Sequence, residues 1–171
     1  YVKLANRIAL VTGATKGIGF AVAKRFAAEG AHIIATGRSV AGLEALDDDI
    51  KAMGGTATLV PLDLLESDKI ELLAANIAQR FGKLDILVGN AGILGELTPV
   101  PHIDPQDWDK VMAINLTANF HLIRCFDTLL KTSSAPRAMF VSSGVTGGAY
   151  PYWGAYAVSK SALEKMVETY A

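Results

Sequence analysis

The sequence has little of several features that would direct a chain to a particular environment. Cys125 is its one cysteine, so no internal disulfide is possible and a reducing compartment, the cytoplasm, is expected. No apolar run approaches the ~18–20 residues that span a bilayer, and the N-terminal stretch lacks the pattern of a secretory signal. The 16 Lys and Arg residues nearly balance the 17 Asp and Glu residues, for a net charge of −1. Neither a nucleic-acid nor a membrane partner is therefore expected.

Metal chemistry and thiol chemistry are also disfavoured by what the chain contains. Its three histidines, His32, His102 and His121, are far apart and form no ligand cluster, so no metal site is expected. Cys125 lies among apolar residues in "FHLIRCFDTLL", which favours a small core residue over a nucleophile.

Short apolar runs rich in β-branched residues alternate along the chain with segments of helical spacing. Strands are expected at 7–12, 32–36, 56–63, 84–92 and 137–143. Helices are expected at 16–30, 40–53, 67–80 with Ser67 as the cap, 105–131, and from 154 onward. This alternation predicts an α/β fold: a doubly wound parallel sheet with helices on both faces. No internal boundary is evident, so residues 1–171 are expected to form a single domain.

A glycine-rich turn, "VTGATKGIG", joins the first expected strand to the first expected helix. Such a turn allows positive φ and close backbone approach, and the helix N-terminus that follows it attracts a phosphate. Gly13, Gly17 and Gly19 have the spacing G-x-x-x-G-x-G, which differs from both G-x-G-x-x-G and the P-loop. A turn that needs glycine for packing alone is the alternative interpretation.

The end of the second expected strand bears on which dinucleotide could bind. NAD sites usually place an acid there for the ribose 2′-hydroxyl, but this strand ends "ATGRS", with Arg38 and no acid. A guanidinium suits a 2′-phosphate, and Lys16 adds a second positive charge. NADP(H) is therefore predicted over NAD(H), although Arg38 could also be an ordinary surface residue.

Tyr156 and Lys160 lie four residues apart at the start of the last expected helix and so share a face of it. Hydride transfer to a ketone builds negative charge on oxygen, which needs a proton donor. A free phenol, with a pKa of ~10, exchanges protons poorly near neutrality, and a nearby ammonium favours its ionised form. Ser143, at the end of the fifth expected strand, could polarise the carbonyl; Ser142 competes for this role, but the thirteen-residue spacing to Tyr156 favours Ser143.

In these motifs the chain resembles the short-chain dehydrogenase/reductase family: TGxxxGIG on 12–19, "GNAG" on 89–92, and Y-x-x-x-K on 156–160. The resemblance implies an enzyme that interconverts a carbonyl and a secondary alcohol. It implies catalytic roles for Asn115, Ser143, Tyr156 and Lys160. It also implies that the cofactor is bound by Gly13, Thr15, Lys16, Gly17, Ile18, Gly19, Arg38, Ser39, Asp63, Leu64, Asn90, Ala91, Gly92, Tyr156 and Lys160.

The resemblance gives some of these residues specific roles. Asp63 would bond the adenine, and Asn115 would hold a water that links Lys160 to solvent, although Asn115 could instead satisfy backbone groups in a bent helix. Gly89 departs from the asparagine more common in the family. A homo-oligomer, a dimer or a tetramer, is a further implication of the resemblance, and a non-catalytic dinucleotide sensor on the same fold is the alternative function.

The resemblance also implies more chain than is present, because only five of seven family strands are found. The apolar fifth strand would then lie at an open edge of the sheet, and the chain is expected to be part of a longer protein. Leu94, Val145, Tyr150, Tyr152 and Trp153 suggest an apolar to amphipathic carbonyl or alcohol as the small-molecule substrate. The aromatic residues among them could equally be packing.

Overall fold

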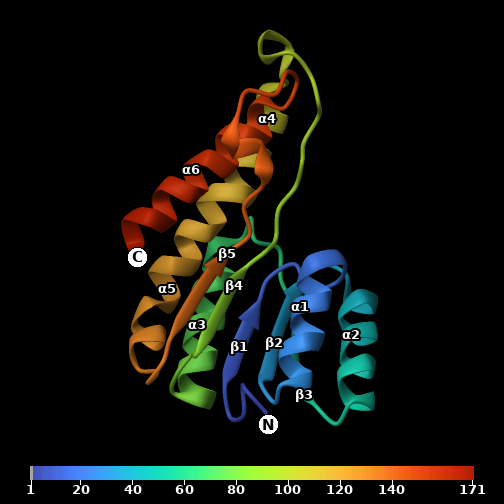
Figure 1. The fold of residues 1–171 in the computed structure, drawn as a ribbon, viewed down its shortest axis with the longest axis vertical. Coiled ribbons are helices and arrows are strands. Elements are labelled where there is room, and N and C mark those ends of the chain that lie inside the picture. The colour runs from blue at the N-terminus through green and yellow to red at the C-terminus, as the bar shows by residue number, and fades with distance from the viewer. Residues whose placement is uncertain (1) are drawn as a thin grey trace.

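The computed structural model describes residues 2–171 and contains five parallel strands in one sheet (Figure 1). The sheet order is β3-β2-β1-β4-β5. The strands are β1 (Ile8–Val11), β2 (His32–Gly37), β3 (Thr56–Pro61), β4 (Ile86–Gly89) and β5 (Arg137–Phe140). The doubly wound parallel sheet predicted from the sequence is confirmed, and β5 lies at an edge of it, as expected.

Helices cover both faces of the sheet. They are α1 (Gly17–Ala28), α2 (Val40–Ala52), α3 (Ser67–Phe81), α4 (Pro105–Met112), α5 (Ala118–Lys131) and α6 (Gly154–Tyr170). In Figure 1, α1 and α2 lie on one side of the sheet, and α3 and α5 lie on the other. Short 3₁₀ turns, Val100–His102 and Gly144–Gly147, lie in the loops before α4 and α6.

Alternation along the strands builds two cores. On β1, Ala9 and Val11 pack with α1 and α2, whereas Leu10 packs on the opposite face with α3 and α5. These side chains are completely buried because β1 is the middle strand of the sheet, covered on both faces. Cys125 is half-buried against the second core, and burial raises the pKa of its thiol, which disfavours the reactive thiolate form.

The strand order reverses beside β1, which pairs with β2 on one side and β4 on the other. In an open α/β sheet, the loops that leave the carboxyl ends of two such strands diverge and leave a crevice between them. The glycine turn follows β1 and "NAG" follows β4, so both motifs lie at this crevice. The topology therefore places the predicted cofactor residues at one end of the sheet.

The long helix expected at 105–131 is interrupted. A π-helical turn, Ala113–Thr117, separates α4 from α5. The periodicity of apolar residues cannot reveal such a turn, because the chain continues in the same direction with one altered set of hydrogen bonds. The prediction of Ser67 as a helix cap was also wrong: Glu66 occupies that position, and Ser67 is the first residue of α3.

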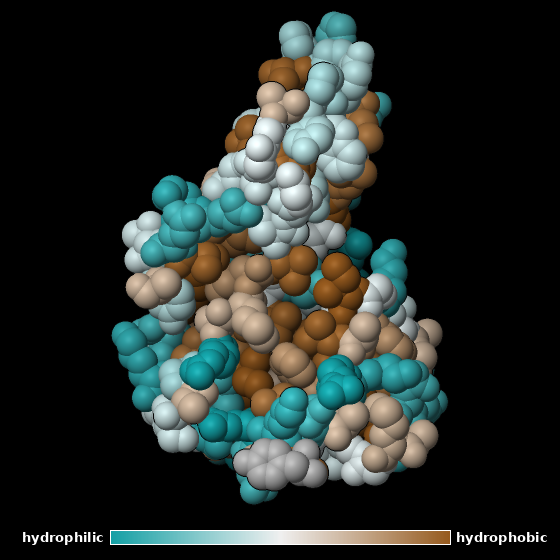
Figure 2. Space-filling view, viewed as in Figure 1, coloured by the Kyte–Doolittle hydropathy of each residue, from teal (hydrophilic) through white to brown (hydrophobic). Residues whose placement is uncertain are grey.

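The upper part of the molecule in Figure 1 is formed by α4, the loop that precedes it and the loop that leads into α6, which project beyond the sheet. Figure 2 shows apolar side chains gathered in the middle of the same view, in a hollow below this projection. Met139, on the edge strand β5, is 43% exposed. Within residues 2–171, no helix is both long and apolar enough to cross a membrane.

Candidate active site

A cavity of about 630 Å³ opens at the carboxyl ends of β1 to β4. Most of the residues predicted to bind the cofactor line it: Gly13, Thr15, Lys16, Gly17, Arg38, Ser39, Asp63, Leu64, Asn90, Ala91 and Gly92. Ile18 lines a neighbouring cavity instead, and Gly19 lines neither. The crevice predicted at the switch point therefore exists and has the size of a ligand site.

The glycines of the turn have two different reasons to be glycine. Gly13 and Gly17 have φ values of +63° and +58°, which side chains with a Cβ rarely adopt. Gly19 is buried, and a Cβ on it would collide with the Asn90 side chain and the Gly13 carbonyl. Gly19 thus lets α1 approach the turn closely, which explains why it does not line the cavity.

Hydrogen bonds join the glycine turn to the "NAG" motif. The Thr12 hydroxyl accepts from the backbone N–H groups of Asn90 and Ala91, at 3.0 and 3.1 Å. In return, the Asn90 side chain donates to the carbonyls of Thr12 and Gly13, at 2.9 and 3.2 Å. Two motifs more than 70 residues apart therefore form one rigid wall of the cavity.

Two exposed cations, Lys16 and Arg38, line this cavity, and the first turn of α1 contains no acidic residue. Ser39, beside Arg38, caps α2 by accepting from the Gly42 N–H at 3.1 Å. Asp63 lines the wall that follows β3, and its carboxylate accepts from the Leu65 N–H at 3.1 Å. This arrangement offers positive charge and unpaired backbone N–H groups to an anionic ligand.

A second cavity, of about 380 Å³, adjoins the first, since Asn90, Gly92 and Ile93 line both. Its walls include three of the four predicted catalytic residues, Ser143, Tyr156 and Lys160. The Lys160 Nζ atom is 5.8 Å from the centre of the Tyr156 ring and donates to the Val141 carbonyl at 2.7 Å. Lys160 is only 3% exposed, and its burial lowers the pKa of its ammonium.

The two candidate serines have different surroundings, although both line the second cavity. The Ser142 hydroxyl donates to the Glu164 carboxylate at 2.5 Å. The Ser143 hydroxyl accepts from the Val145 N–H at 3.4 Å, and none of the hydrogen bonds among residues 2–171 has this hydroxyl as its donor. The Ser143 proton is therefore available to a ligand, whereas that of Ser142 is engaged.

Asn115 lies in the π-helical turn and is completely buried. Its amide oxygen accepts from the Ile93 N–H, and its amide nitrogen donates to the Ile93 carbonyl, both at 2.8 Å. The same nitrogen lies 3.0 Å from the Ser159 hydroxyl. The side chain thus pairs with the backbone of the loop after β4, and not with that of its own helix, and it ties the wall after β4 to α6. A catalytic role for Asn115 stays a prediction.

Of the five apolar residues predicted to surround a substrate, only Leu94 and Trp153 line the second cavity. The Trp153 ring stands edge-on to Tyr156, with 6.0 Å between the ring centres. Tyr150 and Tyr152 are more than half exposed, and Val145 is buried. Val145 therefore packs inside the protein, Tyr150 and Tyr152 neither line the cavity nor are buried by packing, and Trp153 is the aromatic residue beside the predicted acid.

Sequence reasoning missed three residues that organise the site: Thr12, Ser159 and Glu164. Thr12 could have been predicted as a site residue, because it is the first residue of the TGxxxGIG motif. The partners of its hydroxyl, however, follow a strand that is distant in sequence. Ser159 and Glu164 look like ordinary helix residues until the fold brings Asn115 and Ser142 to them. Among residues 2–171, no group of three or more potential metal ligands comes together.

Comparison with known proteins gives the same picture. The model of the short chain dehydrogenase family matches residues 7–171. The oxidoreductase YciK of Escherichia coli K12 is 39% identical over 171 residues, which cover 98% of this chain and 68% of that protein. A 3beta-hydroxysteroid dehydrogenase of Mediterraneibacter gnavus is 36% identical, over 97% of this chain and 60% of its own length.

Solved structures agree closely with the fold. A short chain dehydrogenase from Shigella flexneri 2a, complexed with NADP, superimposes with a TM-score of 0.94 at 38% identity and covers 99% of this chain and 73% of its own. The chain spans 55 to 68% of the length of the curated relatives it matches. The five-stranded sheet, the glycine turn at its switch point and the match over residues 7–171 lead to one conclusion: this chain belongs to the short chain dehydrogenase family.

Proposed function

We propose that the protein is an NADP-dependent oxidoreductase that interconverts a carbonyl and a secondary alcohol, with Tyr156 as the general acid and base. One observation carries the proposal. Tyr156, Lys160 and Ser143 line one cavity, which shares a wall with the larger cavity built on the glycine turn. A substrate in the smaller cavity would therefore meet both a proton donor and a cofactor held in the larger one.

The residues of the larger cavity fit a phosphorylated dinucleotide. Gly13 and Gly17 give the backbone the positive φ angles of a tight cradle, and Lys16 and Arg38 supply two cations at its walls. A bound nicotinamide dinucleotide supplies or accepts the hydride. Asp63 would bond the adenine, as the family resemblance implies, and Arg38 would meet the 2′-phosphate.

The proton chemistry belongs to this chain's own side chains. During reduction, the Tyr156 hydroxyl donates its proton to the carbonyl oxygen as negative charge develops there; during oxidation, the phenolate accepts the proton from the alcohol. The Lys160 ammonium, 5.8 Å from the centre of the Tyr156 ring, places a positive charge beside the proposed proton donor. The Ser143 hydroxyl donates a hydrogen bond to the substrate oxygen and polarises it without giving up the proton.

The surroundings of the second cavity support an apolar to amphipathic carbonyl compound or alcohol as substrate. Leu94, Trp153 and Ile18 supply apolar walls, and Ser142, Ser143, Tyr156 and Lys160 supply polar groups. A homo-oligomer formed through α5 and α6 is also part of the proposal, because Phe120 on α5 and Val158 on α6 are 49% and 45% exposed. The cytoplasm is the proposed compartment.

The decisive variant is Tyr156→Phe in the whole protein. We expect kcat to fall by about 10²–10⁴-fold, because the ring stays in place and only the proton donor is lost. The Kd for NADPH, measured by fluorescence, should change less than about threefold. Tyr150→Phe is the matched control, since Tyr150 is 53% exposed and lies outside both cavities.

Two outcomes would reject this function. Turnover that survives Tyr156→Phe would exclude the mechanism. Tight NADPH binding by the wild type, without turnover across a broad panel of ketones and alcohols, would favour the dinucleotide sensor instead.

A further inference from the structure

The segment that carries Ser143 is held to α6 at both of its ends. On one side of Ser143, the Lys160 ammonium donates to the Val141 carbonyl at 2.7 Å. The Ser142 hydroxyl donates to Glu164 Oε1 at 2.5 Å, and on the far side the Thr146 hydroxyl lies 3.0 Å from the same carboxylate oxygen. One half-buried carboxylate therefore brackets the predicted catalytic serine.

Thr146 connects this carboxylate to the backbone of Ser143 itself. Its one hydroxyl proton is shared between two acceptors, the Ser143 carbonyl oxygen at 2.9 Å and Glu164 Oε1 at 3.0 Å. Its N–H donates to the same Ser143 carbonyl at 3.3 Å. The Ser143 hydroxyl in turn accepts from the Val145 N–H, within the same short 3₁₀ turn. Movement of Thr146 away from α6 would therefore move the main chain that sets the direction of the Ser143 side chain.

Glu164 belongs to the same face of α6 as the predicted acid and cation. It lies one turn after Lys160 and two turns after Tyr156. One helix face thus presents Tyr156 and Lys160 to the cavity and Glu164 to the serine segment. The distance from Tyr156 to Ser143 is consequently set by hydrogen bonds from a single rigid element.

We propose that Glu164 is a positioning residue for the reaction: its carboxylate anchors Ser142 and Thr146 to α6 and so fixes Ser143 beside Tyr156. This inference rests on the proposed function, because Ser143 matters to the reaction only in a carbonyl oxidoreductase. Glu164 acts through Ser143 and does not itself line either cavity.

The hydrogen-bond geometry distinguishes this role from a general charge effect. Oε1 alone accepts from Ser142 and lies within hydrogen-bond distance of Thr146. A glutamine carbonyl oxygen can occupy the same place and accept the same bonds, whereas alanine leaves both hydroxyls without this partner. Glu164→Gln is therefore the rescuing variant and Glu164→Ala is the disrupting one.

The kinetic test compares these variants in the whole protein with NADPH and a ketone that the wild type reduces. Glu164→Ala should lower kcat by about 10- to 100-fold, as expected for a misplaced catalytic group, and Glu164→Gln should stay within about threefold of wild type. Kd for NADPH should not change, because the larger cavity lies on other elements. Thr146→Val should act in the same direction, with less than multiplicative effects in the double variant.

Glu168→Ala is the matched control, since Glu168 lies one turn further along α6 and pairs at the surface with Lys165, its one ion-pair partner among residues 2–171. We expect it to leave kcat unchanged. Equal kcat values for Glu164→Ala and Glu164→Gln would overturn the proposal.

A second readout needs no turnover: amide hydrogen exchange of residues 143–148 in the three Glu164 forms, without substrate. We expect faster exchange in Glu164→Ala than in wild type, and wild-type exchange in Glu164→Gln. Unchanged exchange in Glu164→Ala would overturn the anchoring by itself. Because Tyr156→Phe tests the proposed function separately, failure of that function and failure of the anchor give different results.

Discussion

At the larger cavity, glycines determine the shape of the backbone, and two cationic side chains supply the charge. The glycine turn shapes a cradle that any dinucleotide could use, whereas the cations at its rim, Lys16 and Arg38, would discriminate among ligands in the proposed function. Arg38 lies at the end of β2, and Lys16 lies at the start of α1, so the two approach the cavity from different elements. Specificity for a phosphorylated ribose would then depend on side chains that can be changed without altering the cradle.

The proposed preference for NADP is therefore expected to depend on Arg38. A guanidinium–phosphate hydrogen bond contributes about 1.5–3 kcal/mol, so Arg38→Ala should lower kcat/KM for NADP by about 10- to 100-fold and leave that for NAD nearly unchanged. The loss should shrink at high salt, because Arg38 is exposed. Arg124→Ala, on the remote surface of α5, is the control. A wild-type preference for NAD, or equal losses with both cofactors, would contradict this prediction.

At the scale of elements, the π-helical turn converts a long helix into a support for the site. It directs Asn115 inward, where the side chain forms two hydrogen bonds with the Ile93 backbone and one with Ser159 on α6. Gly92, next to Ile93, lines both cavities, and a Cβ there would lie 3.4 Å from Lys160 Nζ. The wall after β4, the long helix and α6 are therefore coupled through one buried amide.

This coupling predicts graded effects from two substitutions. Asn115→Ala leaves the Ile93 backbone groups unpaired at the cavity wall and should lower the free energy of unfolding by about 2–3 kcal/mol, together with kcat. Ser159→Ala removes one of the three hydrogen bonds of the Asn115 side chain and should lower the free energy of unfolding by about 1 kcal/mol. Urea unfolding and steady-state rates measure both. Equal stability of the two variants would show that the Ile93 bonds contribute nothing.

The sequence predicts the features of these elements that depend on neighbouring residues, but not those that depend on contacts between distant segments. Short apolar runs mark the five strands to within a few residues. The runs of β1, β2 and β4 contain β-branched residues and are largely buried, whereas β5 has none and is only half-buried. The turn at 113–117 was not predictable, since residues of the same helical spacing continue through it. Glu164 was not predictable either, because an acidic residue on a helix is ordinary until a loop from β5 arrives beside it.

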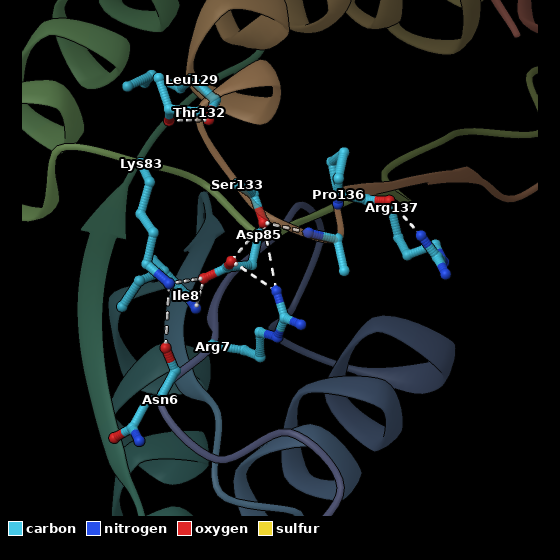
Figure 3. A network of polar contacts seen from close by, with 11 residues as sticks. Asn6, Arg7, Ile8, Lys83, Asp85, Leu129, Thr132, Ser133, Pro136 and Arg137 are labelled. Atoms are coloured by element: carbon cyan, nitrogen blue, oxygen red, sulfur yellow. Dashed lines mark hydrogen bonds and ion pairs between the residues drawn. The ribbon is translucent and has the colours of Figure 1, made fainter.

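At the scale of the whole molecule, one end of the sheet forms the candidate site and the other end is stabilised by buried polar contacts. The carboxyl end holds both cavities, and the amino end is held together by Asp85, the residue before β4 (Figure 3). Its buried carboxylate pairs with Arg7 at 3.0 Å and Lys83 at 2.8 Å. It also accepts from the Ser133 hydroxyl at 2.6 Å and the Ile8 N–H at 2.9 Å. These partners lie at the start of β1, just before β4, and in the loop that leads to β5.

Stability at low pH should therefore depend on Asp85. Burial alone would raise the pKa of its carboxyl group, but the bonds from Lys83, Ser133, the Ile8 N–H and Arg7 outweigh burial and lower it from 3.8 to about 2. Because the folded pKa lies below the unfolded one, the carboxylate contributes its stability above about pH 4 and loses it as the pH falls toward 2. The difference corresponds to about 2 kcal/mol.

Asp85→Asn, compared with wild type by urea unfolding from pH 7 to pH 2.5, measures this contribution. The variant should be less stable by about 2 kcal/mol or more at pH 7, because Arg7 and Lys83 then lack a charged partner, and the deficit should narrow below pH 4. Asp49→Asn is the matched control: Asp49 pairs with Lys24 at the surface, 46% exposed, and should change stability by less than about 1 kcal/mol. A deficit of equal size at pH 7 and pH 2.5 would mean that packing around residue 85, and not its charge, holds the amino end of the sheet.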